Sequence, residues 1–219
     1  MKIPFSILCL VLSFQSYAVN VGSITSFIDS KSDTVVKEIA NESKEARLIL
    51  VKVIEIDEPT NKGTVINNNP KNLLLSPSKV ILPADTKEKI KFFYNGPKDD
   101  KERYYRIIWT DSNISNKSDK STSKKKAFAT TTAVISTILV VTPRKEEFKY
   151  SLSNNVLINQ GNSSYHVVAY GQCIKDKKEK CKEDYYDLPG TKRTFKNIDL
   201  NDKQSFIGIW HEKNFITVK

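Results

Sequence analysis

Residues that build catalytic and metal centres are scarce in this sequence. Its 219 residues include two histidines, three cysteines and one methionine. The G-x-S-x-G, P-loop and G-x-G-x-x-G motifs of hydrolases, nucleotide-binding proteins and dinucleotide-binding enzymes are all missing. We therefore predict a protein that is not an enzyme and that uses no metal or other cofactor.

Two short stretches begin like metal-binding motifs but lack the residues that would complete them. Residues 211–212 read His-Glu, as in zinc proteases, but Phe215 stands where the second histidine is required. Residues 199–202 read D-L-N-D, as in a calcium loop, but the required glycine and closing glutamate are absent. The two histidines, His166 and His211, lie in strand-like runs, where packed or surface positions are far commoner than catalytic bases.

Long hydrophobic runs are also missing from the body of the chain. No segment after the N-terminus approaches the roughly 20 apolar residues of a membrane-spanning helix, so we expect no membrane insertion. At the N-terminus, Lys2 precedes the apolar run 3–14, and Ser16 and Ala18 are the small residues of a cleavage site. Residues 1–18 are therefore predicted to be a secretory signal peptide.

Cysteine usage after export indicates one disulfide. Cys9 lies inside the predicted signal peptide, which leaves Cys173 and Cys181 in the mature chain. Two cysteines on either side of a short polar loop in an exported protein are typical of a local disulfide. A metal site would need more ligands, because two thiolates without a nearby histidine are half a set.

The net charge of +10 does not by itself indicate a nucleic-acid partner. Lysines are spread along the chain and alternate with Asp and Glu, apart from the run at residues 124–126. The export signal also separates the protein from most nucleic acids. We interpret the charge as a solvated surface with one basic loop and expect no nucleic-acid partner.

Strand patterns dominate the mature chain, and almost no helix is predicted. After a loose apolar segment at 21–29, strands are predicted at residues 34–40, 47–56, 73–83, 87–94, 103–111 and 127–143. Two prolines within 73–83 favour an edge or sheet-switching segment over a central strand. This spacing of short strands is typical of an immunoglobulin-like β-sandwich.

Two of these strands indicate how the core is built. Residues 47–56 supply apolar surface through five side chains: Leu48, Leu50, Val53, Ile54 and Ile56. Because side chains alternate along a strand, residues 103–111 place Tyr105, Ile107 and Trp109 on one face and Tyr104, Arg106 and Ile108 on the other.

The remainder of the chain, residues 144–219, is long enough for a second and smaller β domain. Its strands are predicted at residues 148–152, 156–159, 165–173, 191–198, 205–211 and 215–218. About 75 residues bury little surface on their own, so the predicted disulfide would stabilise this domain. We expect an all-β protein with two immunoglobulin-like sandwich domains, at residues 19–143 and 144–219, joined at a hinge near residues 142–147.

The longest predicted strand, residues 127–143, follows a polar segment. It reads A-F-A-T-T-T-A-V-I-S-T-I-L-V-V-T-P, an alternation rich in β-branched residues that ends at a proline, and is roughly twice the usual strand length. Residues 113–126 before it are polar and basic, which predicts a mobile loop. The pattern alone leaves two interpretations open: the last strand of the first domain, packed internally, or a strand that projects beyond its own sheet.

Four stretches of the sequence resemble a known family. They are L-L-L-S-P-S-K-V-I-L-P-A at 73–84, F-F-Y-N-G-P at 92–97, K-E-R-Y-Y-R-I-I-W at 101–109 and T-I-L-V-V-T-P-R at 137–144. With the signal peptide, two sandwich domains and long strand, the chain resembles the PapD-like periplasmic chaperones of pilus assembly, and is most similar to the common-pilus (Ecp/Mat) type. The resemblance covers the whole mature chain and implies a PapD-like pair of immunoglobulin-like domains.

The resemblance also implies a mechanism, donor-strand complementation. A pilus subunit lacks its last strand, and the chaperone lends its own long strand, here about residues 127–141, before an outer-membrane usher receives the subunit. Pilus subunits and the usher would be the partners, in the periplasm. The odd-numbered residues of the strand share one face, called the odd face, which has fewer polar residues than the even-numbered face. We therefore expect these odd-face residues to enter the subunit's groove: Ala129, Thr131, Ala133, Ile135, Thr137 and Leu139.

One feature of the best-known family members has no counterpart here. They anchor the subunit's C-terminal carboxylate with an arginine on the first strand and a lysine on the long strand, whereas residues 21–28 and 138–141 contain neither. Arg106 and Arg144 are the remaining candidate cations, since arginine pairs well with carboxylates. For Arg144, an ion pair with Glu102 that holds the hinge is at least as good an interpretation.

Two other classes of exported β protein stay open. A pilus subunit or adhesin would carry an extra N-terminal extension of alternating residues, and residues 19–23 are too short for one. A carbohydrate- or surface-binding immunoglobulin-like module would bind without a protein client. Only scattered Tyr and Trp residues point to such a platform.

Overall fold

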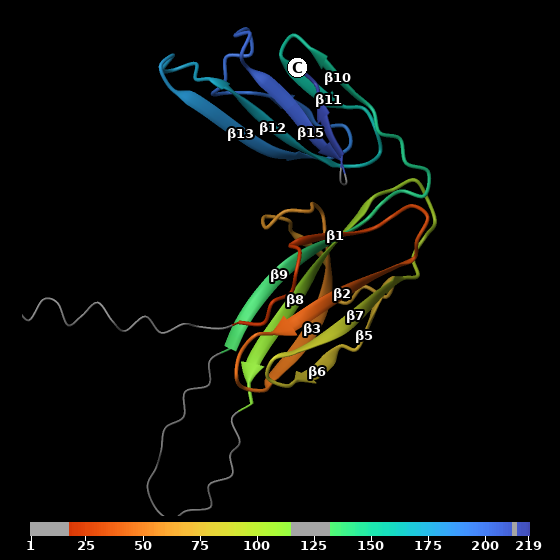
Figure 1. The fold of residues 1–219 in the computed structure, drawn as a ribbon. Coiled ribbons are helices and arrows are strands. Elements are labelled where there is room, and N and C mark those ends of the chain that lie inside the picture. The colour runs from red at the N-terminus through yellow and green to blue at the C-terminus, as the bar shows by residue number, and fades with distance from the viewer. Residues whose placement is uncertain (1–17, 115–131, 212–213) are drawn as a thin grey trace, which may run out of the picture.

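A computed structural model describes residues 18–114, 132–211 and 214–219 of the protein. These residues form sixteen β-strands and no helix, which confirms the predicted all-β class. The described part accordingly has no helix that is long and apolar enough to cross a membrane. The strands gather into two units, with β1 to β9 in one and β10 to β16 in the other (Figure 1).

Two sheets make up the first unit. The larger sheet has the order β1-β9-β8-β3-β4, with β6 also paired to β3. Its strands are β1 (Thr25–Ile28), β3 (Arg47–Ile56), β4 (Val65–Asn67), β6 (Lys79–Leu82), β8 (Arg103–Asn113) and β9 (Thr132–Val141). The smaller sheet has the order β2-β7-β5, with β2 (Thr34–Asn41), β5 (Leu73–Ser76) and β7 (Thr86–Tyr94). The short strand β4 was not predicted, and β1 lies within what was predicted only as a loose apolar segment.

The chain changes sheets at Pro77. β5 pairs with β7 in the smaller sheet, whereas β6 pairs with β3 in the larger one. The peptide bond before Pro77 is cis, and Pro83 follows the last residue of β6. Because proline cannot donate to a ladder, both prolines lie just outside the strands. The predicted sheet-switching segment at residues 73–83 is confirmed.

The core of the first unit is built around Trp109. Its side chain is fully buried, its ring centre lies 6.2 Å from that of Phe92, and its Nε1 donates to Thr137 Oγ1 at 2.9 Å. Tyr105 and Ile107 are buried in the same cluster, as the predicted face of β8 requires. The indole therefore contributes a large apolar surface without leaving a buried donor unpaired.

Strand β3 corrects one part of the predicted core. Leu50 is 41% exposed and Leu48 is half-buried, while the other three predicted side chains of this strand are buried. Ile49 and Val51 face the core instead. The prediction was wrong here because an unbroken run of Leu, Ile and Val carries no period from which its inward face can be identified.

The second unit also consists of two sheets. One has the order β10-β11-β14, with β10 (Tyr150–Ser153), β11 (Val156–Asn159) and β14 (Lys192–Thr194). The other has the order β13-β12-β15-β16, with β12 (Tyr165–Gln172), β13 (Lys180–Asp187), β15 (Phe206–His211) and β16 (Asn214–Thr217). Leu157, Val167 and Ile207 are among the fully buried residues of its core.

Strand β13 was not predicted from the sequence. It reads K-C-K-E-D-Y-Y-D and lies at the edge of its sheet, paired only with β12 among the described strands. Its buried positions include the charged residues Glu183 and Asp187, so the strand shows no apolar alternation and its pattern is weak. The predicted disulfide is confirmed near the turn between these two strands, where Cys173 and Cys181 are joined with Cα atoms 5.1 Å apart.

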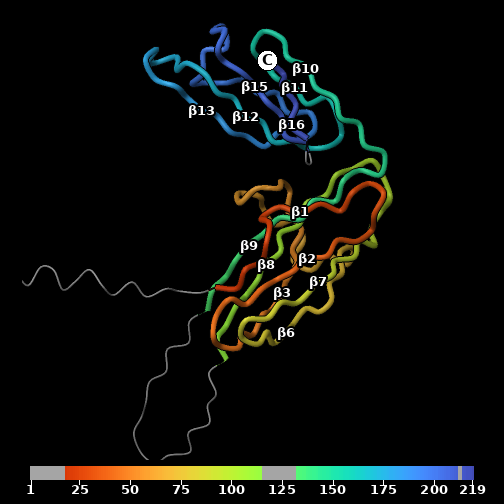
Figure 2. The backbone as a smooth tube through the Cα atoms, in the orientation of Figure 1, coloured from red at the N-terminus to blue at the C-terminus, as the bar shows by residue number. Residues whose placement is uncertain are grey.

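Residues 142–149 connect the two units. β9 ends at Val141 and β10 begins at Tyr150, and Figure 2 traces the backbone between them. The first part of the connection is held against the first unit, because Thr142 N donates to Ile28 O and Arg144 N donates to Asp99 O. The predicted division between residues 143 and 144 falls within this connection and stays a prediction.

Candidate functional site at the edge of β9 and in the cleft between the units

Strand β9 is covered by a neighbouring strand along only part of one edge. On one side it pairs with β8 over its whole described length, from Thr132 to Val141. On the other side the parallel strand β1 pairs only with the four residues from Ile138 to Val141. Among the described residues, no strand lies beside 132–137 on that side. Within the described part of the chain, the N-terminal half of β9 is therefore an open sheet edge.

The backbone geometry shows which groups this edge presents. Ile138 N donates to Ile24 O at 2.8 Å, and Thr142 N donates to Ile28 O at 3.1 Å, so even-numbered residues turn their backbone groups toward β1. Because these groups alternate sides along a strand, the N–H and C=O of residues 132, 134 and 136 point to the open edge. Such unpaired groups are a template for another strand.

The odd face of β9 runs from the protein's own core toward its rim. Leu139 is 0% exposed, and Thr137 is also buried, with its hydroxyl bound to Trp109. Ile135 and Ala133 are half-buried, and Ile135 packs against the same core. Leu139 and Thr137 thus belong to internal packing, which corrects the prediction that these two side chains enter a partner's groove. The roles of Ala133 and Ile135 stay a prediction, as do those of Ala129 and Thr131, which lie outside the described residues.

The even face changes character at the same point of the strand. Val134 is 64% exposed, and Thr132 and Ser136 are exposed beside it. Ile138 and Val140 are buried in a separate apolar cluster on the outer face of the larger sheet, close to the second unit. β9 therefore has an exposed half, Thr132 to Ser136, and a half from Thr137 onward in which every side chain is buried.

The two candidate cations are both engaged with the protein itself. Arg106 Nη2 donates to the carbonyls of Thr60, Asn61 and Gly63, at 3.1, 3.3 and 3.0 Å. This guanidinium stabilises the turn between β3 and β4. A role for Arg106 toward a carboxylate of a partner stays a prediction.

Arg144 does not pair with Glu102, so the predicted hinge ion pair is wrong. Its guanidinium donates to the carbonyls of Ser30 and Ser32 and to the carboxylate of Asp33. The side chain follows the connection back along the first unit, where the β1–β2 turn supplies these acceptors. Hydrogen bonds from Lys98 and Arg144 hold the pKa of Asp33 below its usual value.

Glu102 instead joins the two units through a backbone group. Its Oε2 accepts from Tyr104 Oη at 2.7 Å and from Ser164 N, which lies just before β12, at 2.8 Å. Burial raises the pKa of this carboxyl, because the two hydrogen bonds do not fully replace the lost water. Glu102 thus contacts both units through Ser164 N and not through Arg144, and its predicted role at the hinge stays a prediction.

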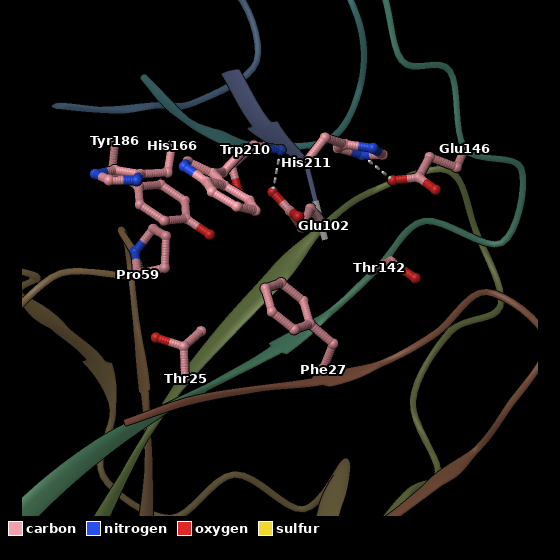
Figure 3. Close-up of a pocket in the computed structure, with 11 residues that line it drawn as sticks. Thr25, Phe27, Pro59, Glu102, Thr142, Glu146, His166, Tyr186, Trp210 and His211 are labelled. Atoms are coloured by element: carbon pink, nitrogen blue, oxygen red, sulfur yellow. Dashed lines mark hydrogen bonds and ion pairs between the residues drawn. The ribbon is translucent and has the colours of Figure 1, made fainter. Parts of the chain in front are cut away.

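A cleft of about 370 Å³ opens beside Glu102, between the two units (Figure 3). The first unit and the connection line it with Thr25, Phe27, Pro59, Glu102, Thr142 and Glu146. The second unit contributes Ser164, His166, Tyr186, Trp210 and His211. No lysine or arginine is among these lining residues. Sequence reasoning missed this cleft, because Tyr186 lies on the unpredicted strand β13 and a Trp on a short strand carries no distinctive pattern.

Both histidines in the cleft have carboxylate partners. His211 Nε2 lies 2.9 Å from Glu146 Oε1, and its ring stacks on Phe148 with ring centres 4.2 Å apart. His166 Nε2 contacts Asp184 on the neighbouring strand. In the described part of the chain, no group of three or more His, Cys, Asp or Glu residues is arranged to hold a metal ion.

Comparisons with known proteins identify the family to which this chain is similar. Residues 148–218 match the family model described as the EcpB C-terminal domain. Over all of both chains, the protein is 41% identical to a probable fimbrial chaperone EcpB from Escherichia coli O157:H7. Among solved structures, the periplasmic chaperone SfaE is similar with a TM-score of 0.61 at 10% identity, covering 91% of this chain and 98% of that one.

A second structure has the same PapD-like fold. It comes from a complex of the Salmonella enterica SafA pilin with the SafB chaperone, and is similar with a TM-score of 0.55 at 12% identity. The match covers 94% of this chain and 92% of that one. The structural likenesses confirm the predicted fold, and the full-length sequence identity settles the family. The chain belongs to the EcpB family of fimbrial chaperones.

Proposed function

We propose that this protein is a periplasmic chaperone that binds pilus subunits by donor-strand complementation and delivers them to an outer-membrane usher. The observation that carries the proposal is the open edge of β9 at residues 132–137, which can pair with a strand of another protein. Membership of a chaperone family supports this function over a pilus subunit or a sugar-binding module, and supports a role without enzymatic chemistry.

The chemistry of the exposed half explains how one chaperone strand could serve several subunits. Main-chain hydrogen bonds along residues 132, 134 and 136 do not depend on the partner's sequence. On the odd face, Ile135 offers one large side chain; because it is already half-buried, covering the rest of it would contribute less than the roughly 1.5 to 3 kcal/mol of a fully exposed one. Ala133 contributes less because it is small. Binding of this kind is strong enough to cover a groove and leaves room for a better-fitting strand to replace it.

The location follows from the predicted signal peptide. Residues 1–17 lie outside the described part of the chain, but their sequence carries a basic start, an apolar run and a small-residue cleavage site. A disulfide in the second unit is also typical of an oxidising compartment such as the periplasm. Both features support the periplasm as the place where the chaperone works.

Co-expression with a candidate pilus subunit from the same organism tests the proposal. We expect a one-to-one complex, and degradation of the pilin when the chaperone is absent. Replacing the half-buried Ile135 by Asp places a charge on the lent face and should abolish pilin protection. The matched control is Val36→Asp, at an exposed position of β2 outside this edge, which should protect like the wild type.

Two results would contradict the proposal. A pilin that accumulates in folded form without the chaperone would show that no strand needs to be lent. Full protection by the Ile135→Asp variant would remove the odd face of β9 from the contact. Soluble yield and circular dichroism of both variants check that loss of protection does not come from an unfolded chaperone.

A further inference from the structure

The cleft between the two units contains the carboxylate of Glu102, which pairs with no lysine or arginine of the described residues. Both hydrogen bonds to Glu102, from Tyr104 and from Ser164 N, end on Oε2. Oε1 has no hydrogen-bond partner among the described residues. No lysine or arginine is among the described residues that line the cleft, and Glu146 adds a second acidic group that acts on Glu102. A ligand that carries positive charge would therefore be favoured here.

A second polar group in the wall lacks a partner. Ser164 is 6% exposed and lines the cleft, yet its Oγ has no hydrogen bond within the described part of the protein. Buried hydroxyls are normally paired, and an unpaired one costs free energy. Because Ser164 N binds the Glu102 carboxylate, the unpaired hydroxyl and the free oxygen Oε1 belong to neighbouring residues of one site.

Aromatic side chains form the rest of the wall. Trp210 is 45% exposed on β15, and Figure 3 shows it beside Tyr186, with Phe27 on the opposite unit. Aromatic faces attract ammonium and guanidinium groups through the negative charge of their π-systems. The cleft thus combines three aromatic rings with a carboxylate and a hydroxyl that both accept hydrogen bonds.

The other charged groups of the cleft are already paired. Glu146 binds His211, and His166 binds Asp184 on the next strand. Figure 3 shows His166 on one side of Trp210 and the Glu146–His211 pair on the other, whereas no histidine, lysine or arginine of the described residues pairs with Glu102. A carboxylate ligand in this position would meet the negative groups Glu102 and Glu146 and would be disfavoured.

We propose that this cleft binds an arginine or lysine side chain of the bound pilus subunit, with Glu102 and Ser164 as acceptors and Trp210 as an aromatic wall. Guanidinium, with five donors in a planar fork, meets this arrangement best, because it can serve both acceptors while it stacks on the indole. That the side chain comes from a pilus subunit rests on the proposed function. The preference of the cleft for a cation does not.

Tryptophan fluorescence offers a direct test on the full protein. The chain has two tryptophans, and only Trp210 is exposed, since Trp109 is fully buried. The probe is acetyl-Gly-Arg-Gly-amide, compared with the same peptide carrying citrulline, a neutral isostere of arginine, or glutamate. We expect a saturable change of fluorescence with the arginine peptide, at least about tenfold weaker binding of the citrulline peptide, and none of the glutamate peptide.

Variants separate the site from non-specific binding. Glu102→Gln keeps an acceptor for Tyr104 and Ser164 N but removes the charge, and should weaken the arginine peptide about tenfold. Glu88→Gln, at an exposed position of β7, is the matched control and should bind normally. Trp210→Phe should remove the optical signal while calorimetry still detects binding. If Glu102→Gln does not fold, Ser164→Ala is the replacement variant: it keeps the backbone N–H, removes the hydroxyl and should also weaken binding of the arginine peptide.

The result that overturns the inference is equal binding of the arginine and citrulline peptides, or no saturable change with the arginine peptide. Unchanged binding by a folded Glu102→Gln variant would also overturn it. None of these measurements needs a pilus subunit. If the cleft does not bind the arginine peptide, the expected pilin protection in co-expression is unaffected. If the pilin is not protected in co-expression, the expected binding of the arginine peptide in the cleft is unaffected.

Discussion

The two halves of β9 belong to one continuous strand but have opposite environments. From Ile138 onward, side chains are buried on both faces, and β1 and β8 cover both edges. From Thr132 to Thr137, one edge is open and Val134 on the even face is exposed. The difference arises because β1 is only four residues long and starts opposite Ile138. A short neighbouring strand is thus what turns half of a core strand into a binding edge.

The comparison also explains why one face can serve two purposes. The odd side chains point to the same side of the sheet along the whole strand, so Leu139 lies in the core while Ile135 reaches its rim. The protein does not need a separate binding element. It needs a strand that continues beyond the place where its own core ends.

The largest expected effect comes from the buried half. Leu139→Ala should lower the free energy of unfolding by about 2 to 5 kcal/mol, because it removes a fully buried side chain and leaves a cavity. Val134→Ala, in the exposed half, should change it by less than about 0.5 kcal/mol. Urea denaturation of both variants measures the contrast. Similar losses in the two would show that the halves do not differ in packing.

A smaller effect is expected where the two halves meet, at Thr137. Thr137→Val keeps the shape but leaves Trp109 Nε1 as a buried donor without an acceptor, which should cost about 1 to 3 kcal/mol. Thr137→Ser retains the hydroxyl and is the control for loss of the hydrogen bond. If Val is tolerated as well as Ser in urea denaturation, the bond contributes nothing and Thr137 need not be fixed in the core.

Much of this arrangement could be predicted from the sequence, for physical reasons that differ between elements. Clear alternation in residues 103–111 identified the buried face of β8, and two prolines identified the sheet switch at Pro77. The edge strand β13 was missed because two of its buried positions, Glu183 and Asp187, are charged and hide the alternation. The ion pairs could not be predicted either. Arg144 pairs with Asp33 because the connection between the units folds back along the first unit, and no local sequence pattern indicates this.

The candidate site was predicted in outline and missed in detail. The long strand and its odd face follow from composition and parity, but the point where burial ends depends on the length of β1, which reads only as a loose apolar segment. The cleft brings together residues as distant in sequence as Phe27 and Trp210. Such a site arises from the way the two units are placed against each other, and the spacing of its residues in the sequence does not indicate it.

The smallest expected effect concerns Lys37, which supports the entrance to β1 and so the boundary between the two halves. Its Nζ donates to Ser23 O at 2.6 Å and Ser26 Oγ at 3.1 Å, and no carboxylate of the described residues lies within salt-bridge distance. Burial lowers its pKa from 10.5 to about 8. Between these values the unfolded chain binds more protons than the folded one, so this group makes stability rise with pH.

From pH 7.5 to 8.5, the wild type should therefore gain roughly 0.5 kcal/mol in unfolding free energy relative to Lys37→Met, which cannot titrate. Urea denaturation of both proteins at the two pH values measures the difference, and Lys89→Met, on the exposed side of β7, is the control that should follow the wild type. If Lys37→Met shows the same pH dependence as the wild type, the ammonium is not desolvated. The start of β1 would then be held by its backbone pairing with Ile138 alone. The backbone of β9 at the boundary between the two halves would be less rigid than the packing indicates.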